Sequence, residues 1–209
     1  AIEKTSLFAS AETHTVRKPN FAEDFIKDLE TRLNLQWLPG GHGDLEKTIG
    51  ALEVFNYIYA IFHSPTYRRR YAEFLKIDFP RLPVTSDRRL FKQLAELGGQ
   101  LVKIHLLKAA LEIDNDSSFP IQGSNLVEKL TYKEAKVYIN QAQYFDHVTS
   151  EVWEFHIGGY QVCEKWLKDR KGRVLSLEEC SRYLYILAAL AKTRTIMEKI
   201  DETIPNFPI

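Results

Sequence analysis

The sequence has few of the residues that would mark a secreted, membrane-spanning or metal-binding protein. Its only cysteines, Cys163 and Cys180, fall in helix-like patterns without metal-ligand spacing, so buried thiols in a reducing compartment are the simplest interpretation. The longest apolar runs, such as 57–62 and 183–191, are far shorter than the ~20 residues of a membrane span, and no signal peptide is present. We therefore expect a cytoplasmic location and no membrane partner.

An excess of charge of either sign is also missing. The 209 residues include 28 Lys and Arg and 28 Asp and Glu, so the formal net charge is zero and any basic surface must be local. The length suits one globular domain with a sizeable core. The chain begins with Ala1 and its single methionine is Met197, which leads us to expect a segment of a longer polypeptide.

No familiar catalytic or cofactor-binding motif occurs in the chain. A phosphate-binding loop would need Gly-Lys-Ser/Thr at the start of a helix, and the Gly-rich stretch 40–43 follows a Leu-Pro break, which favours a turn. The six histidines form no His-Glu-x-x-His pair, and no serine lies in a Gly-x-Ser-x-Gly elbow. His105 lies beside apolar neighbours, as a core histidine would. We expect no catalytic residue, metal site or cofactor in this chain.

The hydrophobic periodicity predicts an α+β fold that is mostly helical, with a small antiparallel sheet inserted between long helices. Residues 1–19 are polar and aperiodic, which is typical of a linker from a preceding domain, and residues 20–209 form the remaining domain. β-branched and aromatic runs in residues 125–157 predict three or four strands. Apolar residues at helical spacing predict the helices 21–38, 45–63, 66–76, 87–107, 160–171 and 177–196.

Capping residues mark the boundaries of these predicted helices. The residues expected at helix ends are Asn20, Asp44, Pro65, Ser86 or Asp87, Gly172 and Ser176. The Gly98-Gly99 pair inside the fourth helix costs about 1 kcal/mol per glycine relative to Ala. A close helix crossing or a kink is therefore expected there.

One predicted helix ends in several cations. Its polar positions and the following turn form a set that we call the 161–173 cluster: Gln161, Lys165, Lys168, Arg170, Lys171 and Arg173. Gln161, Lys165 and Lys168 share one helix face, opposite an apolar stripe. Cations on a rigid helix end suit phosphate oxygens, and Gln161 or Arg173 could read a base edge. The alternative is a surface helix with cations near its negative dipole end.

A second group of cations, the 68–70 cluster, consists of Arg68, Arg69 and Arg70. Successive positions spread around a helix axis, so these side chains do not form one face. A solvated helix surface or packing against a neighbouring domain is the simplest interpretation, and a second contact with DNA is the alternative.

Three stretches resemble a known family. They are FNYIYAIFHSPTYRRRYAEFLKIDFPRLP (55–83), KVYIN (136–140) and VWEFHIGGYQVCEKWLKDRKGRVLS (152–176). They are similar to the C-terminal specificity domain of type ISP restriction-modification enzymes, and the resemblance covers about residues 20–203. The segment that begins YIYAIFHSP also resembles, more loosely, a region of type I specificity subunits. Type ISP enzymes join a nuclease, a translocating ATPase, an adenine-N6 methyltransferase and a target-recognition domain in one polypeptide.

This resemblance implies a DNA sequence-recognition domain that binds double-stranded DNA and directs an upstream adenine-N6 methyltransferase and nuclease. The 161–173 cluster would position the DNA backbone, and loops of the sheet would read sequence. The methyltransferase's Asn-Pro-Pro-Tyr motif and its glycine loop do not occur here. S-adenosylmethionine, ATP and Mg²⁺ are therefore expected elsewhere in the parent enzyme, and the fragment itself is not expected to be an enzyme.

Two other functions stay open at this point. One is a structural domain that docks on the upstream methyltransferase without contacting bases, with the arginines in interdomain salt bridges. The other is a hydrolase whose site is assembled from residues distant in the sequence.

Overall fold

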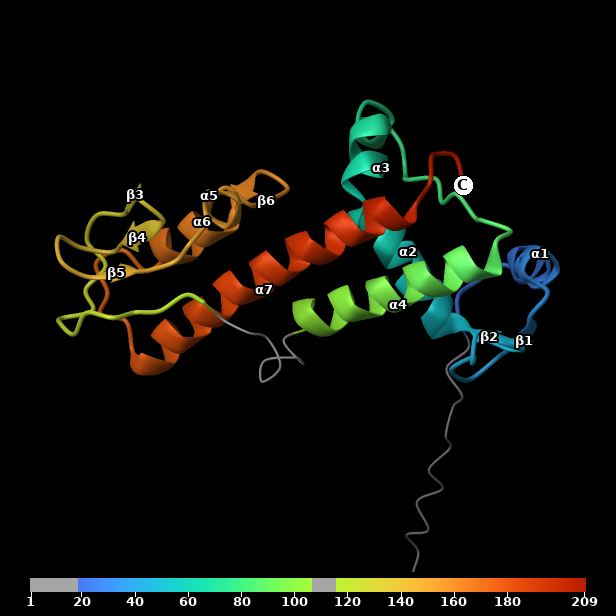
Figure 1. Cartoon of the computed structure of the whole chain (residues 1–209), viewed down its shortest axis with the longest axis horizontal. Coiled ribbons are helices and arrows are strands. Elements are labelled where there is room, and N and C mark those ends of the chain that lie inside the picture. Colours follow the sequence, from blue (N-terminus) through green and yellow to red (C-terminus); the bar gives the residue numbers. More distant parts are fainter. Residues whose placement is uncertain (1–18, 107–115) are drawn as a thin grey trace, which may run out of the picture.

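A computed structural model describes residues 19–106 and 116–209 (Figure 1). The predicted linker 1–19 lies outside the described residues except for Pro19, and so does the predicted end of the fourth helix at residue 107. The described residues mix helices with small antiparallel sheets, which confirms the predicted α+β class. They form two hydrophobic cores that share one long helix, α7 (Leu177–Thr203). We call the two halves the helical module and the sheet module.

The helical module contains the first part of the chain and the C-terminal half of α7. Its elements are α1 (Glu23–Leu33), β1 (Gln36–Leu38), β2 (Thr48–Gly50), α2 (Ala51–His63), α3 (Pro65–Arg70), the 3-10 helix η1 (Phe74–Lys76) and α4 (Arg88–His105). Helices α2 and α4 cross closely at Gly98. A Cβ built on Gly98 would lie 1.9 Å from the carbonyl oxygen of Asn56, so a larger residue would not fit there. The close crossing predicted from the glycine pair is confirmed. Beside it, the buried rings of Tyr57 and Phe91 stack at 4.3 Å.

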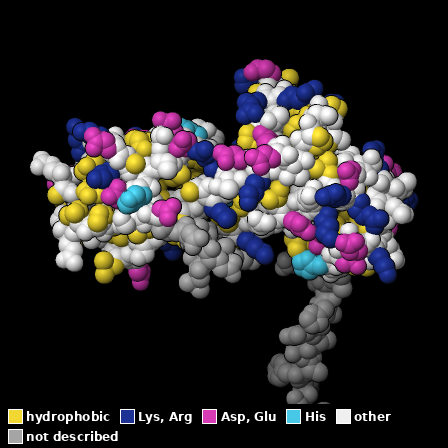
Figure 2. All heavy atoms as spheres, in the orientation of Figure 1, with side chains coloured by type: hydrophobic (Ala, Val, Ile, Leu, Met, Phe, Trp, Pro, Cys, Tyr) yellow, Lys and Arg dark blue, Asp and Glu magenta, His cyan; other side chains and the backbone are white. Residues whose placement is uncertain are grey.

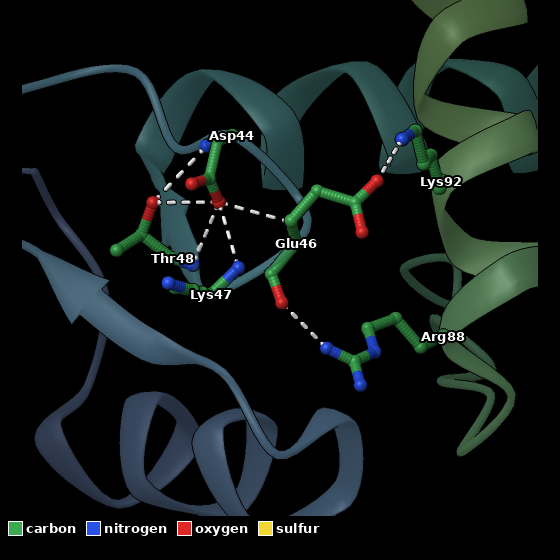
Figure 3. Close-up of polar contacts among 6 residues, drawn as sticks. All are labelled: Asp44, Glu46, Lys47, Thr48, Arg88 and Lys92. Carbon is green, nitrogen blue, oxygen red and sulfur yellow. Dashed lines mark hydrogen bonds and ion pairs between the residues drawn. The ribbon is translucent and has the colours of Figure 1, made fainter.

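The start predicted for the second helix, residue 45 with Asp44 as its cap, is wrong. Helix α2 begins only at Ala51, and the Asp44 carboxylate instead accepts the backbone N–H groups of Glu46, Lys47 and Thr48 (Figure 3). These N–H groups, that of Lys47 first, hold the pKa of Asp44 well below its ordinary value. An aspartate closes a turn as readily as it caps a helix. The turn aligns β2 in parallel with β1, a pairing that the sequence did not predict.

This turn is also attached to α4. The carboxylate of Glu46 pairs with Lys92, and its backbone carbonyl accepts a 2.6 Å hydrogen bond from the Arg88 guanidinium (Figure 3). Asp87 caps α4 by accepting the N–H groups of Arg89 and Leu90, as predicted for this residue.

Two other predicted helices are shorter than expected. Helix α1 follows Ala22, which offers no side-chain cap, so Asn20 does not act as one. Pro65 occupies the first turn of α3 as predicted, but α3 ends at Arg70 and the chain continues through the short helix η1. A 3-10 turn is a common way to end an α-helix.

The sheet module contains the three-stranded antiparallel sheet that the sequence predicted. Its elements are β3 (Thr131–Lys133), β4 (Lys136–Tyr138), β5 (Tyr144–Phe145), α5 (Ser150–Trp153), β6 (His156–Ile157), β7 (Tyr160–Gln161) and α6 (Val162–Lys168). Strand β4 lies in the middle, with Val137 opposite both Tyr132 and Phe145. Val137 and Phe145 are fully buried, together with Cys163 of α6.

Residues near the end of the predicted sheet differ from the prediction. Thr149 caps the short helix α5 where a strand was expected, because its hydroxyl accepts the N–H of Val152. Tyr160 and Gln161 pair with β6 as a hairpin, so α6 begins at Val162 instead of Tyr160. Both cysteines are buried and unpaired as expected, and burial raises the pKa of Cys163 to about 12.

Helix α7 joins the two modules. Ser176 and Glu179 form the predicted capping box, in which each side chain accepts the backbone N–H of the other residue. Tyr183 near its start is buried in the sheet module, whereas Ile200 near its end is buried in the helical module (Figure 1). Within residues 19–106 and 116–209, no helix has both the length and the apolarity that a membrane crossing requires.

Candidate nucleic-acid interface

The 161–173 cluster spans strand β7, helix α6 and the turn that follows. Helix α6 lies on the sheet module because Cys163 and Leu167 are fully buried in its core. Gly172 adopts a left-handed conformation with φ of 79°, which ends the helical turn where the sequence predicted a C-terminal cap. Its N–H donates a 2.7 Å hydrogen bond to the carbonyl of Val127, so the turn is tied to the preceding segment.

Most cations of the 161–173 cluster face carboxylates. The ion pairs are Lys165–Asp169 (2.5 Å), Lys168–Glu164 (2.8 Å), Arg170–Glu179 (3.2 Å) and Arg173–Glu179 (3.1 Å). Within the described part of the chain, Lys171 is the one cation of the cluster without a carboxylate partner. The N–H of Ser176, and then Arg173 and Arg170, hold the pKa of Glu179 below its ordinary value. The cluster is therefore less positive than its sequence suggests.

Two side chains of the cluster, those of Arg170 and Gln161, make contacts within the sheet module. The Arg170 guanidinium lies 3.5 Å from the centre of the Trp166 ring and also donates to the Trp166 carbonyl. The side-chain amide of Gln161 donates a 2.6 Å hydrogen bond to the carbonyl of Trp153. Both side chains fix the position of α6, which leaves Lys165, Lys168, Lys171 and Arg173 as the cations presented to solvent.

The 68–70 cluster has a different set of partners. Arg68 donates a 2.6 Å hydrogen bond to the carbonyl of Phe62, and burial lowers its pKa. Arg69 donates to the Thr66 hydroxyl and lies 3.9 Å from Asp201. Arg70 lies 6.0 Å from the centre of the ring of Tyr71. Among the residues that the structure describes, Arg69 is the one arginine of this cluster with a carboxylate partner, so most of the positive charge is uncompensated.

The net charges of the two segments that contain these clusters also differ. Residues 65–89 carry seven Lys and Arg against three Asp and Glu, a net charge of +4, whereas residues 160–179 carry five against four, a net charge of +1. Figure 2 shows Lys and Arg side chains gathered on the projection that contains α3 in Figure 1. The more positive segment is therefore in the helical module.

A cleft of about 490 Å³ separates the two modules. It is lined by Tyr59, His63 and His105 from the helical module, by Thr193 from α7, and by Ile157 from the β6–β7 hairpin. His105 is hydrogen-bonded at both ring nitrogens, to the Tyr59 hydroxyl (2.7 Å) and to the Thr193 hydroxyl (3.0 Å). Burial lowers the pKa of His63 to about 4. This grouping could not be predicted from the sequence, because its residues come from elements that are distant along the chain.

The polar residues of the described ranges form no metal centre. In residues 19–106 and 116–209, no three His, Cys, Asp or Glu side chains lie close enough together to hold an ion. The buried hydroxyl of Ser64 does contact a carboxylate, since it donates a 2.5 Å hydrogen bond to Asp201. Ser64 also accepts the N–H of Tyr67 as the cap of α3, which gives this contact a structural role.

Comparison with known proteins gives the chain a family. The sequence model described as the type ISP C-terminal specificity domain matches residues 2–199. No curated protein sequence matches the chain significantly.

Three solved structures contain a similar fold. One is a nuclease-deletion mutant of the type ISP restriction-modification enzyme LlaGI in complex with a DNA substrate mimic (22% identity over 78% of this chain and 14% of that chain, TM-score 0.55). Another is the ATP-dependent type ISP restriction-modification enzyme LlaBIII bound to DNA (18% identity over 75% of this chain and 11% of that chain, TM-score 0.54). The third is a DrdV–DNA complex (16% identity over 89% of this chain and 20% of that chain, TM-score 0.63). The chain thus spans between 11% and 20% of those polypeptides.

Proposed function

The chain belongs to the type ISP C-terminal specificity domain family, and on that premise we propose that it is a DNA sequence-recognition domain. It binds duplex DNA and directs an adenine-N6 methyltransferase and nuclease, upstream in the same polypeptide, to their site. The family match carries this proposal, and the three similar folds were each determined with DNA or a DNA mimic. S-adenosylmethionine, ATP and Mg²⁺ would bind outside this chain, in a cytoplasmic parent enzyme.

In this proposal, the exposed part of the 161–173 cluster contacts the DNA backbone. The side chains of Lys165, Lys168 and Arg173 are about half exposed, and exposed ion pairs contribute only about 0–1 kcal/mol. Phosphate oxygens can therefore compete with the carboxylates for these cations. Arg173 also has the planar donor pattern that reads a guanine edge, whereas Gln161 would first have to release the carbonyl of Trp153.

The uncompensated charge of the 68–70 cluster favours a second candidate function. A domain that docks on the upstream methyltransferase would need cations that acidic side chains of this chain do not already neutralise. Arg68 and Arg70 have no carboxylate partner within the described residues. Docking through this cluster is compatible with DNA recognition through the sheet module.

A salt titration tests the proposed function. Binding of a fluorescently labelled duplex is measured by anisotropy at several salt concentrations, for the wild type and for a variant with Lys165, Lys168, Lys171 and Arg173 changed to Gln. Each phosphate contact contributes about −0.9 to the slope of log K against log salt, so four lost contacts reduce the slope by about three to four units. The exposed positions should leave the Tm nearly unchanged.

Two outcomes contradict the proposal in different ways. If the wild type does not bind duplex DNA even at low salt, DNA recognition by this chain is wrong. If the variant binds with an unchanged slope, DNA recognition stands but the 161–173 cluster is not the surface that contacts phosphates.

A further inference from the structure

The β6–β7 hairpin presents a narrow, open tip. Ile157 pairs with Tyr160 and His156 pairs with Gln161, and the turn between the strands consists of Gly158 and Gly159. Gly158 has a φ of 59°, a conformation that favours glycine. A Cβ built on either glycine would meet no atom within 4 Å, so both glycines have open space beside them, and Ile157 and Gly158 also border the cleft between the modules.

The base of this hairpin is fixed to the sheet module. The N–H of Val162 donates to the carbonyl of Phe155 at 3.0 Å, which closes the ladder. The amide of Gln161 donates to the carbonyl of Trp153, and a ring nitrogen of His156 lies 2.6 Å from the carbonyl of Glu154. A tip held on such a base is ordered before it meets a partner, which reduces the entropic cost of binding.

Two large apolar side chains of the hairpin face solvent together. Ile157 is 61% exposed and Tyr160 is 64% exposed. They are cross-strand partners, so their side chains lie on the same face of the ribbon. Since neither side chain is buried within its own module, the pair is available to another molecule.

The surroundings of this pair indicate the charge of that molecule. The Lys165 ammonium lies 5.9 Å from the centre of the Tyr160 ring, at the start of the 161–173 cluster. Residues 156–179 carry five Lys and Arg against four Asp and Glu, a net charge of +1, and Lys165, Lys168, Lys171 and Arg173 are the cations that face solvent. An apolar tip next to cations suits a partner that has an anionic backbone and apolar groups recessed between its charges, as duplex DNA has.

The width of the hairpin selects one groove of the duplex. Paired strands lie about 4.8 Å apart. The major groove is about 12 Å wide and admits a two-stranded ribbon, whereas the minor groove is only about 6 Å wide. The apolar group that the major groove displays is the C5-methyl group of thymine.

We infer, on the basis of the proposed DNA-binding function, that the β6–β7 hairpin enters the major groove and contacts base edges. Ile157 packs against thymine methyl groups, and the Tyr160 hydroxyl hydrogen-bonds to a neighbouring base edge or phosphate. The hairpin therefore reads sequence, while the cations of the 161–173 cluster hold the backbone.

Removing the thymine methyl groups tests this inference. A labelled pool of duplexes with a randomised centre is made with thymine, and a matched pool is made with uracil, which lacks only the methyl group. The wild type should bind the thymine pool about fourfold more tightly for each methyl group that it buries. The variant Ile157→Ala should bind both pools with nearly equal affinity.

Control variants separate a direct contact from a structural effect. Ile77→Ala removes an apolar side chain that is 85% exposed in the helical module, and it should keep the wild-type preference for thymine. Tyr160→Phe keeps the ring and removes the hydroxyl, so it should lower affinity for both pools by a similar factor. The salt slope should be the same for all these variants, because none of them changes a charge.

Each outcome is assigned to one proposal. If the wild type binds neither pool at low salt, the proposed function fails and the inference fails with it. If the wild type binds both pools equally, with the salt slope described above, DNA binding stands and the role of the hairpin is overturned. A lowered Tm of Ile157→Ala would instead show that Ile157, which also borders the cleft, packs against the helical module.

Discussion

The two cation-rich segments of this protein look alike in the sequence and differ in the structure. The 161–173 cluster contains more cations than the 68–70 cluster, but its segment has a net charge of +1 and that of the 68–70 cluster has +4. Within the described residues, carboxylates pair with four of the five cations of the first cluster, whereas in the second cluster only Arg69 has a carboxylate partner, at 3.9 Å. A count of cations therefore says little about the electrostatic potential that a partner meets.

The first prediction concerns which of the two clusters binds DNA. Neutralising that cluster should have the largest effect of the four changes. Neutralising Lys165, Lys168, Lys171 and Arg173 should weaken duplex binding about a hundredfold at moderate salt, because four phosphate contacts are lost. Changing Arg68, Arg69 and Arg70 to Gln should alter the salt slope by less than about one unit. Anisotropy titrations of both variants measure the difference. A larger loss of slope in the second variant would assign the DNA-binding surface to the helical module.

The second prediction compares one arginine from each cluster. Arg170→Ala removes the stacking on Trp166 and the hydrogen bonds to Trp166 and Glu179, so it should destabilise the fold by about 2 kcal/mol. In a chain of this length, that change lowers the Tm by about 5 °C. The matched control, Arg70→Ala, should change the Tm by less than about 1 °C, because the contact that Arg70 makes among the described residues is a distant one, with the ring of Tyr71. Similar Tm values for the two variants would contradict a structural role for Arg170.

The third prediction concerns pH and is specific to the helical module. Burial, followed by the nearby Arg68 charge, holds the pKa of His63 near 4, below its ordinary value of 6.5. The unfolded chain therefore binds a proton more readily, and stability should fall as the pH decreases from about 6.5 towards 4. Since the ring is partly exposed, we expect an effect of only about 1 kcal/mol.

The variant His63→Phe provides the control for this pH effect. It keeps a ring that can stack on Tyr59 but cannot take up a proton. The loss of Tm between pH 7 and pH 4.5 should be smaller in the variant by about 3 °C. An identical loss in both proteins would show that other groups cause the acid sensitivity.

The fourth prediction removes the neutralising charges and has the smallest expected effect. The double variant Glu164→Gln and Asp169→Asn leaves Lys168 and Lys165 without their ion-pair partners. DNA affinity should rise about threefold, because phosphates no longer compete with carboxylates for these lysines. The two exposed i,i+4 pairs contribute about 0.3–0.5 kcal/mol each, so stability should fall by less than about 1 kcal/mol. Unchanged affinity would mean that these lysines do not face the DNA.

Part of the difference between the clusters was visible in the sequence. Asp169 follows Lys165 by four positions and Glu164 precedes Lys168 by four, which is the spacing of ion pairs along a helix. The pairing of Arg170 and Arg173 with Glu179 could not be predicted, because Glu179 belongs to the next helix. Which residues of the 161–173 cluster contact DNA stays a prediction.

The sequence by itself determined the features that depend on neighbouring residues. The capping box of Ser176 and Glu179, the left-handed Gly172 and the small sheet follow from short-range sterics, capping hydrogen bonds and side-chain periodicity. The tertiary structure alone decided the attachment of the Asp44 turn to α4, the cleft between the modules and the exposure of Ile157 and Tyr160. Partners that meet in space are chosen by the packing of whole elements, and local patterns do not contain that information.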